Sequence, residues 1–187
     1  MATGSIPQSY DRAQRAFHWI MAGLILLAIA IGVIAWWLPE RTSPRVELLM
    51  LHKSLGMTVL ALAILRIVYR AVVGAPPYGR TLTPLMRAGA DFAHFALYAL
   101  MIALPVIGYV ASTAGGHEVS WFGLFVFPAL APQDKALGHL AAQAHFWLGW
   151  IIITVLALHF AAAAWHLWVK RDDIFARMWP GKATFMR

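Results

Sequence analysis

The sequence predicts an all-α membrane protein, built as a bundle of four transmembrane helices. Hydrophobic residues make up 61% of the 187 residues and charged residues only 12%, and four separate stretches are long and apolar enough to cross a bilayer. Soluble globular domains carry about 25% charged residues, so a water-soluble fold would lack polar surface. Disorder is excluded as well, because disordered chains have few apolar residues and high charge. We expect a single membrane domain over residues 1–187, since the chain is too short for two large domains.

The first predicted span covers residues 17–38, which contain no Asp, Glu, Lys or Arg. A spanning helix needs about 20 mostly apolar residues, whereas the apolar core of a signal peptide has about 7–15. No small-residue cleavage site follows the stretch, so we expect a retained helix. The second span, residues 48–73, is apolar except for Lys53, Arg66 and Arg70.

The third predicted span covers residues 92–113 and carries no formal charge. It contains Pro105, where we expect a kink. The chain then runs uncharged over residues 136–169, within which we place the fourth span at 142–169. A fifth apolar run, residues 119–130, is too short to cross the bilayer, and its aromatic side chains suit an interfacial loop or a re-entrant turn.

Proline and hydroxyl residues mark where the later helices begin. Ser43 before Pro44 and Thr83 before Pro84 each offer a cap followed by proline at the first helical position. Pro132 is placed to start the fourth helix early, outside the bilayer.

The distribution of basic residues predicts that both termini are cytoplasmic. With this orientation eleven Lys and Arg residues lie inside and four lie outside. The net charge of +7 is therefore a topology signal, and nucleic acid is not needed to explain it. The inner residues are Arg12, Arg15, Arg66, Arg70, Arg80, Arg87, Lys170, Arg171, Arg177, Lys182 and Arg187, and the outer ones are Arg41, Arg45, Lys53 and Lys135.

The chain has no cysteine and eight histidines. The absence of cysteine excludes disulfides, thiolate-held iron–sulfur clusters, cysteine nucleophiles and covalent haem attachment. Ionisable side chains within membrane spans are costly and usually functional, so the histidines are the candidate site residues.

Two histidines of the fourth span, His145 and His159, are 14 residues apart, which places them about 21 Å apart along a helix and about 40° apart around it. They share one face, one toward each side of the bilayer, as two stacked metal or haem sites require. His52, at the outer end of the second span, is placed to pair with His145. His18, at the inner end of the first span, is placed to pair with His159, and His94 competes for this position because depth alone does not separate the two.

Histidines in pairs favour haem over a bare metal ion. Zinc and copper sites gather three or four ligands at one depth, often with carboxylates or thiolates, whereas carboxylates are absent from these spans. Two imidazoles on opposite faces of a porphyrin complete six-coordinate iron, which suits electron transfer. Gly32, Gly56 and Gly149 lie near the histidines and would give a flat macrocycle room, although glycines also serve helix packing.

Together these residues resemble the bacterial cytochrome b561 family, within the wider group of di-haem, four-helix membrane cytochromes b. The resemblance covers nearly the whole chain. Its marks are Phe17-His18-Trp19, His52, His94, Ala103-Leu104-Pro105-Val106-Ile107-Gly108, His145, His159, His166 and Arg177-Met178-Trp179-Pro180. The resemblance implies two haem b groups, with His18, His52, His145 and His159 as axial ligands to the haem iron. It leaves His94 and His166 as candidates for a quinone pocket.

The chain is similar in particular to a member of the family that acts as a superoxide oxidase. That resemblance implies a multi-pass protein of the bacterial inner membrane that passes electrons from periplasmic superoxide to ubiquinone. Arg41, Arg45 and Lys53 are then candidates for steering the superoxide anion to the outer haem. Two alternatives are a cytochrome b membrane anchor that links a dehydrogenase or hydrogenase partner subunit to quinone, and a non-redox transporter or structural bundle.

Overall fold

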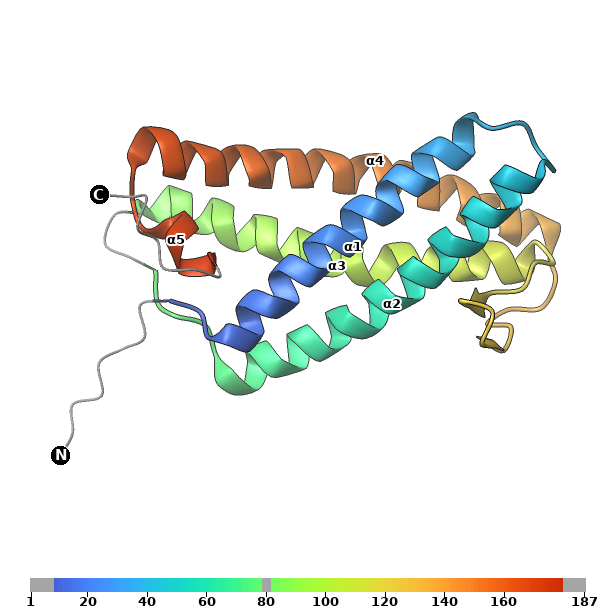
Figure 1. The fold of residues 1–187 in the computed structure, drawn as a ribbon, viewed down its shortest axis with the longest axis horizontal. Coiled ribbons are helices and arrows are strands. Elements are labelled where there is room, and N and C mark those ends of the chain that lie inside the picture. The colour runs from blue at the N-terminus through green and yellow to red at the C-terminus, as the bar shows by residue number, and fades with distance from the viewer. Residues whose placement is uncertain (1–8, 79–81, 180–187) are drawn as a thin grey trace.

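The computed structural model describes residues 9–78 and 82–179 and confirms the four-helix architecture. The helices are α1 (Arg12–Trp37), α2 (Ser43–Val73), α3 (Pro84–Ala114) and α4 (Lys135–Trp165), shown in Figure 1. Each is long and apolar enough to cross a membrane. Three basic residues counted for orientation, Arg80, Lys182 and Arg187, lie outside the described residues.

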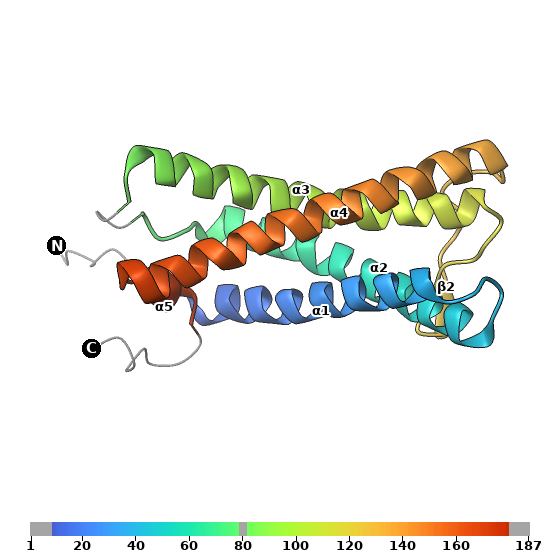
Figure 2. The same cartoon turned by 90° about the horizontal axis from the view of Figure 1, so that it is seen from above.

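The helices alternate in direction along the chain, and α1 packs on α2, α2 on α3 and α3 on α4 (Figures 1 and 2). Helix α4 continues into a π-helical turn, η1 (His166–Lys170), which is followed by the short helix α5 (Ile174–Met178). Helix α5 returns to the start of α1, where the indole Nε1 of Trp19 donates a hydrogen bond of 2.9 Å to the Met178 carbonyl oxygen. We call the end that carries α5 the inner end, following the charge-based orientation, and the opposite end the outer end.

Capping side chains fix where the helices begin. The Thr83 hydroxyl accepts a hydrogen bond from the N–H of Met86 ahead of Pro84, as predicted. At the start of α2 the residue in the cap position is Thr42 rather than the expected Ser43. Ser43 is the first residue of the helix, and its hydroxyl donates a hydrogen bond of 2.7 Å to a Glu47 carboxylate oxygen.

The start of helix α4 differs from the sequence expectation. Helix α4 begins at Lys135 rather than at Pro132, because the Asp134 carboxylate caps it by accepting hydrogen bonds from the N–H groups of Ala136 and Leu137, the second and third residues of the helix. Helix α3 continues as one helix through Pro105.

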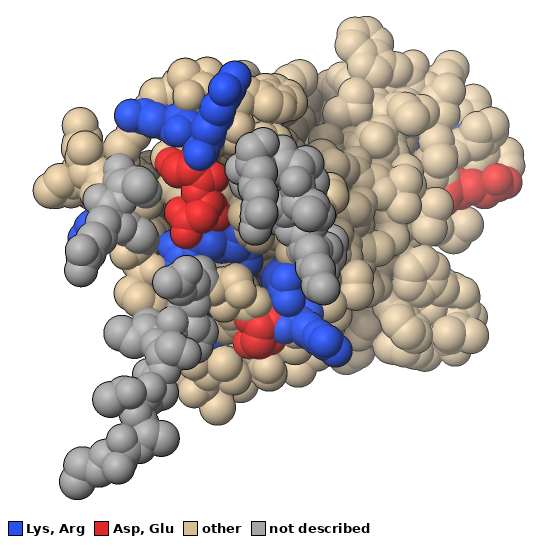
Figure 3. Space-filling view, turned by 60° about the vertical axis from the view of Figure 1, so that its left-hand side comes forward, with Lys and Arg blue, Asp and Glu red and all other residues tan. Residues whose placement is uncertain are grey.

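The packed core lies at mid-height between the helices and is small. Its buried side chains are Met21, Ile25, Val59, Ala63 and Met101. Large apolar side chains instead cover much of the outer surface of the bundle. Charged side chains gather at the inner end, while the flank of the bundle seen beside it is almost free of charge (Figure 3). This inverted pattern, apolar outside and charged at the ends, is that of a protein in lipid.

The short apolar run between α3 and α4 forms a β-hairpin. Strands β1 (Ser120–Trp121) and β2 (Phe125–Val126) pair antiparallel. The turn between them uses positive φ angles at Phe122 and Gly123, the backbone geometry of a tight hairpin turn.

Candidate functional site

The structure brings together the two histidines expected at the outer end. His52 of α2 and His145 of α4 face each other with ring centroids 5.9 Å apart and ring planes at 86°. Metal–imidazole bonds are about 2.0–2.1 Å long, so two imidazoles on opposite sides of one metal ion hold their centroids about 6 Å apart. The spacing of the outer pair therefore fits one iron between the rings.

Each outer ring binds a backbone carbonyl oxygen through Nδ1, the ring nitrogen that faces away from the other histidine. His52 Nδ1 lies 2.9 Å from the Ala28 carbonyl oxygen of α1, and His145 Nδ1 lies 3.0 Å from the Leu104 carbonyl oxygen of α3. A carbonyl oxygen only accepts, so the ring proton is on Nδ1 and Nε2 keeps its lone pair. Metal-binding histidines are usually oriented in this way.

A glycine one helical turn after each of these carbonyls makes room for the ring. A Cβ atom added to Gly32 would lie 3.0 Å from His52 Cε1, and one added to Gly108 would lie 2.9 Å from His145 Cε1. The same local arrangement thus occurs twice, on α1 and on α3. From the sequence we expected the space beside Gly32 to hold a macrocycle, whereas in the structure the His52 ring fills it. Nothing in the sequence indicated that Gly108 makes room for His145.

The outer pair lines a cavity of about 500 Å³ between the four helices, a volume within the range of small-molecule and cofactor sites. Its walls are almost entirely apolar. Gly56 and Gly149 line it, and a Cβ added to either would meet no atom within 4 Å. The cavity therefore leaves open space beside both glycines, as a flat macrocycle requires.

Two of the three predicted steering residues reach this cavity. Arg45 and Lys53 are part of its lining. Arg45 also donates a hydrogen bond of 2.8 Å to the Leu38 carbonyl oxygen, and Lys53 donates one of 3.0 Å to the Glu118 carbonyl oxygen. Arg41 is exposed in the loop between α1 and α2 and is not among the lining residues.

At the inner end three histidines lie together rather than two. The ring centroid of His159 in α4 is 6.3 Å from that of His18 in α1 and 5.7 Å from that of His94 in α3. Both spacings suit a shared metal ion, so distance does not choose between His18 and His94. His94 Nδ1 is buried and has no hydrogen-bond partner within the described residues.

A basic residue of the second span, which we expected near the propionates of an inner haem, lies directly beside His18. Arg66 of α2 places Nη2 3.3 Å from His18 Nδ1, and its guanidinium carbon lies 5.5 Å from the centre of the Tyr98 ring. In the described part of the chain no carboxylate forms an ion pair with Arg66. One ring of the inner pair therefore contacts a guanidinium group, whereas the rings of the outer pair contact carbonyl oxygens and share their cavity with Arg45 and Lys53.

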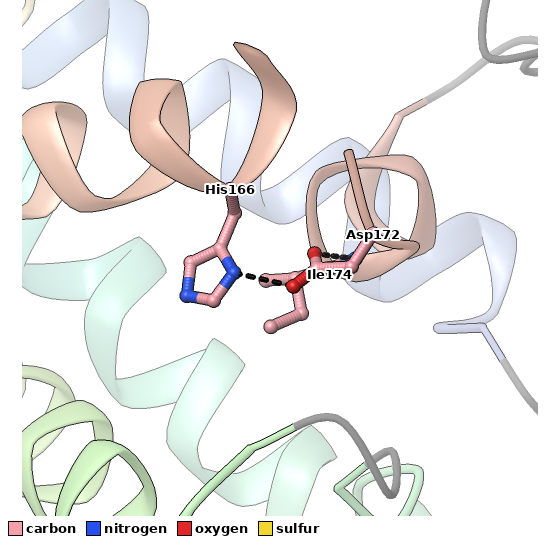
Figure 4. Close-up of polar contacts among 3 residues, drawn as sticks. All are labelled: His166, Asp172 and Ile174. Atoms are coloured by element: carbon pink, nitrogen blue, oxygen red, sulfur yellow. Dashed lines mark hydrogen bonds and ion pairs between the residues drawn. The ribbon is translucent and has the colours of Figure 1, made fainter. Parts of the chain in front are cut away.

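His166, the second predicted pocket residue, is held in the π-helical turn that extends α4. Its Nδ1 lies 2.7 Å from a carboxylate oxygen of Asp172, and both side chains are largely buried (Figure 4). The other carboxylate oxygen of Asp172 accepts a hydrogen bond from the N–H of Ile174. The sequence suggested His166 but not Asp172, because a single π-helical turn, which often occurs at functional sites, cannot be read from apolar periodicity.

The loop before α3 adds a further polar contact at the inner end. The Tyr78 hydroxyl donates a hydrogen bond to an Asp91 carboxylate oxygen. Burial, together with this bond to a carboxylate, raises the pKa of Tyr78 to about 12. The phenol is therefore neutral at any physiological pH.

Comparisons with known proteins point to one family. A family model described as prokaryotic cytochrome b561 matches residues 9–181. The chain is 30% identical to "Cytochrome b561 homolog 2" of Escherichia coli K12 over 178 residues, covering 95% of each chain. It is 28% identical to "Probable superoxide oxidase CybB" of Yersinia pestis over 175 residues, covering 94% of this chain and 98% of the relative. It is also 30% identical to "Cytochrome b562" of Cereibacter sphaeroides over 173 residues, or 90% and 94% of the two chains.

The residues present fit the cofactor that this family implies. Haem b is held without covalent bonds to the protein, which suits a chain without cysteine. The ring spacing of the histidine pairs and the apolar cavity beside the outer pair match its ligation and shape. The chain therefore belongs to the prokaryotic cytochrome b561 family, as a multi-pass electron-transfer protein of the bacterial inner membrane that uses haem b.

Proposed function

We propose that the protein is a superoxide oxidase that binds two haem b groups and passes electrons from periplasmic superoxide to ubiquinone. The observation that carries this proposal is the presence of two histidine pairs along α4, each with the ring spacing of a shared iron. The 14 residues between His145 and His159 separate the pairs by about 21 Å along the helix. The relative named as a probable superoxide oxidase supports the choice of electron donor.

Four histidines hold the cofactors in this proposal, His52 with His145 at the outer end and His18 with His159 at the inner end. Haem b bound in this way supplies one-electron transfer without an open coordination position. The carbonyl oxygens of Ala28 and Leu104 keep the outer rings in the tautomer and orientation that ligation needs.

The outer cavity supplies attraction for an anionic donor. Arg45 and Lys53 bring positive charge to its lining, and an apolar cleft lined by one sign of charge raises the local concentration of the opposite ion. Arg41, in the loop above, adds to the same field. Each superoxide ion gives up one electron and leaves as dioxygen.

The inner end supplies the residues for quinone chemistry. His94 and His166 border the inner pair in this proposal and face the quinone oxygens. Asp172 accepts the Nδ1 hydrogen bond of His166 and orients its Nε2 for proton transfer. Two electrons, from two superoxide ions, and two protons from the inner side convert ubiquinone to ubiquinol.

A spectrum, a haem count and a superoxide challenge test the proposal. Protein purified after haem-replete expression should show b-type absorbance and two haems per chain, and superoxide should reduce them in a stopped-flow instrument until ubiquinone reoxidises them. A colourless protein would exclude any redox role. Two haems that superoxide does not reduce would favour the membrane-anchor function, in which the haems connect a dehydrogenase or hydrogenase subunit to quinone.

A matched pair of variants tests the steering residues. Lys53→Gln removes a charge from the cavity lining, whereas Lys135→Gln removes one from the outer end of α4, outside the lining. We expect Lys53→Gln to slow haem reduction by superoxide and weaken its dependence on ionic strength, and Lys135→Gln to do so less. Equal rates in both variants would remove Lys53 from the steering role.

A further inference from the structure

The hairpin between α3 and α4 lies against the side of α2 rather than above the bundle (Figures 1 and 2). The Ser54 hydroxyl of α2 lies 3.0 Å from the Ser120 carbonyl oxygen and accepts a hydrogen bond of 3.0 Å from the N–H of Phe122. The indole Nε1 of Trp121 donates a bond of 3.0 Å to the Thr58 hydroxyl. These bonds fix the depth of the hairpin along α2.

That depth is below the end of the membrane-spanning segment. Helix α2 has 31 residues, or about 46 Å, so a centred hydrocarbon core of about 30 Å begins about 8 Å below its first residue. Ser54 lies about 16 Å from the start of α2 and therefore about 8 Å inside that boundary. Thr58, the partner of Trp121, lies about 9 Å deeper than His52 of the outer pair.

The N–H groups of the hairpin turn are bonded within the protein. Ser54 Oγ accepts from the N–H of Phe122, and Ser120 Oγ accepts from the N–H of Gly123 at 3.2 Å. The N–H of Leu124 donates to the Trp121 carbonyl oxygen at 2.9 Å. Polar backbone groups in hydrocarbon must be satisfied within the protein, and the three N–H groups of this turn meet that condition.

The two faces of the hairpin differ in what they contact. Val119, just before β1, is 1% exposed and lines the outer cavity. The side chains of Phe122, Leu124 and Val126 point outward and are 48%, 73% and 51% exposed. Residues 119–130 contain no charged side chain. The outward-facing side chains of the hairpin therefore form an apolar surface. On the inner side, Val119 forms part of the cavity wall.

From these contacts we infer that residues 119–127 form a re-entrant hairpin that lies in the outer leaflet, contacts lipid acyl chains through Phe122, Leu124 and Val126, and separates the outer cavity from lipid. Lipid covers the outward face of the hairpin, because the face of α2 on which the hairpin lies continues toward the inner end as a lipid-facing surface. Ser54 and Thr58 share this face with Leu65 and Val72, which are 55% and 80% exposed. The inference depends on the membrane topology and not on the electron donor.

Site-directed spin labelling tests the depth directly, because the chain has no native cysteine. Leu124→Cys carries the nitroxide at the hairpin tip, Leu65→Cys serves as the lipid reference on the same face of α2, and Glu40→Cys in the exposed loop between α1 and α2 serves as the water reference. The labelled proteins are reconstituted into phospholipid bilayers. Relaxation by oxygen, which concentrates in lipid, is then compared with relaxation by a water-soluble nickel chelate.

We expect the label at position 124 to match the label at position 65, with strong relaxation by oxygen and weak relaxation by nickel. Nickel relaxation equal to that at position 40 would place the hairpin in water and overturn the inference. A label shielded from both reagents would mean that protein, such as a second copy of the chain, covers the hairpin, and would also overturn it. Val126→Cys gives an independent reading if the tip label disturbs the turn.

Discussion

Arg66 places a guanidinium nitrogen 3.3 Å from the ring nitrogen Nδ1 of His18, inside the helix bundle. The outer rings of His52 and His145 bind carbonyl oxygens instead. A positive charge beside a ligand disfavours the more positive, ferric state of the iron and so raises its reduction potential. The two histidine pairs therefore differ in what their rings contact. In the proposed two-haem arrangement, the contact of Arg66 with His18 favours electron transfer from the outer haem to the inner one.

We predict that Arg66→Gln lowers the midpoint potential of the inner haem. The expected change in electron distribution between the two haems is on the order of tenfold, or about 59 mV for a one-electron couple. Spectroelectrochemical titration measures both potentials. Arg70→Gln is the matched control, because Arg70 lies one turn closer to the inner end of α2 and its guanidinium group forms a hydrogen bond with Tyr10, not with His18. Equal shifts in the two variants would refute the specific role of the Arg66–His18 contact.

Alanine variants of the inner histidines should show which one binds iron with His159. We expect His18→Ala to bind one haem and His94→Ala to bind two, because the proposed function assigns ligation to His18. A pyridine haemochrome assay with protein quantification gives the ratio. If His94→Ala loses a haem and His18→Ala keeps both, the ligand assignment is reversed.

The glycine behind His145 should be as important as the histidine itself. Gly108→Ala puts a methyl group 2.9 Å from the ring atoms Cε1 and Nδ1 of His145, which forces the ring off the Leu104 carbonyl oxygen. We expect loss of the outer haem with the inner haem retained. Gly23→Ala, where the added Cβ meets no atom within 4 Å, should keep both haems and stabilise α1 by about 0.5–1 kcal/mol. Normal haem content in Gly108→Ala would show that the ring has another position available.

The carboxylate that holds His166 should affect quinone reduction without affecting haem content. Asp172→Asn removes the negative acceptor 2.7 Å from His166 Nδ1. A positioned proton donor contributes about 10²–10⁴-fold to proton-coupled steps, so we expect reoxidation of the haems by quinone to slow by about tenfold or more. Asp173→Asn is the control, since Asp173 is exposed and caps α5 without a side-chain hydrogen bond. If Asp172→Asn left the rate of haem reoxidation by quinone unchanged, the contact between Asp172 and His166 would have no role in proton transfer to the quinone.

Tyr78 should make stability sensitive to alkaline pH. Its pKa is raised to about 12 by burial and by the bond to Asp91, above the value of about 10 for an exposed phenol. The stabilisation is complete below about pH 10 and is lost as the pH rises toward 12. Phenolate absorbance and thermal unfolding across this range should both change in Tyr78→Phe. If the Tyr78→Phe variant and the parent protein lost thermal stability equally as the pH rose, Tyr78 would make no contribution to the alkaline sensitivity.

Much of this molecule follows from physical rules that act locally along the chain. The requirement for about 20 apolar residues per span predicted all four helices, and the Thr83–Pro84 start of α3 followed from capping. The spacing of His145 and His159 predicted one face of α4, because helical geometry fixes the angle between side chains 14 residues apart.

Contacts between distant segments did not follow from such rules. The approach of Arg66 to His18 and the bond from Trp121 to Thr58 depend on how α1, α2 and the hairpin dock, and hydrophobic periodicity carries no information about docking. Gly108 was visible in the sequence, but its purpose required knowing that His145 packs against that turn of α3.

Helix α4 contributes a histidine to each of the two pairs, and it follows the other three long helices in the chain. Neither pair exists while only the first three helices have entered the bilayer. With the ligands proposed above, cofactor loading must therefore wait until α4 has entered the bilayer, and a chain interrupted before α4 would offer no complete ligand pair.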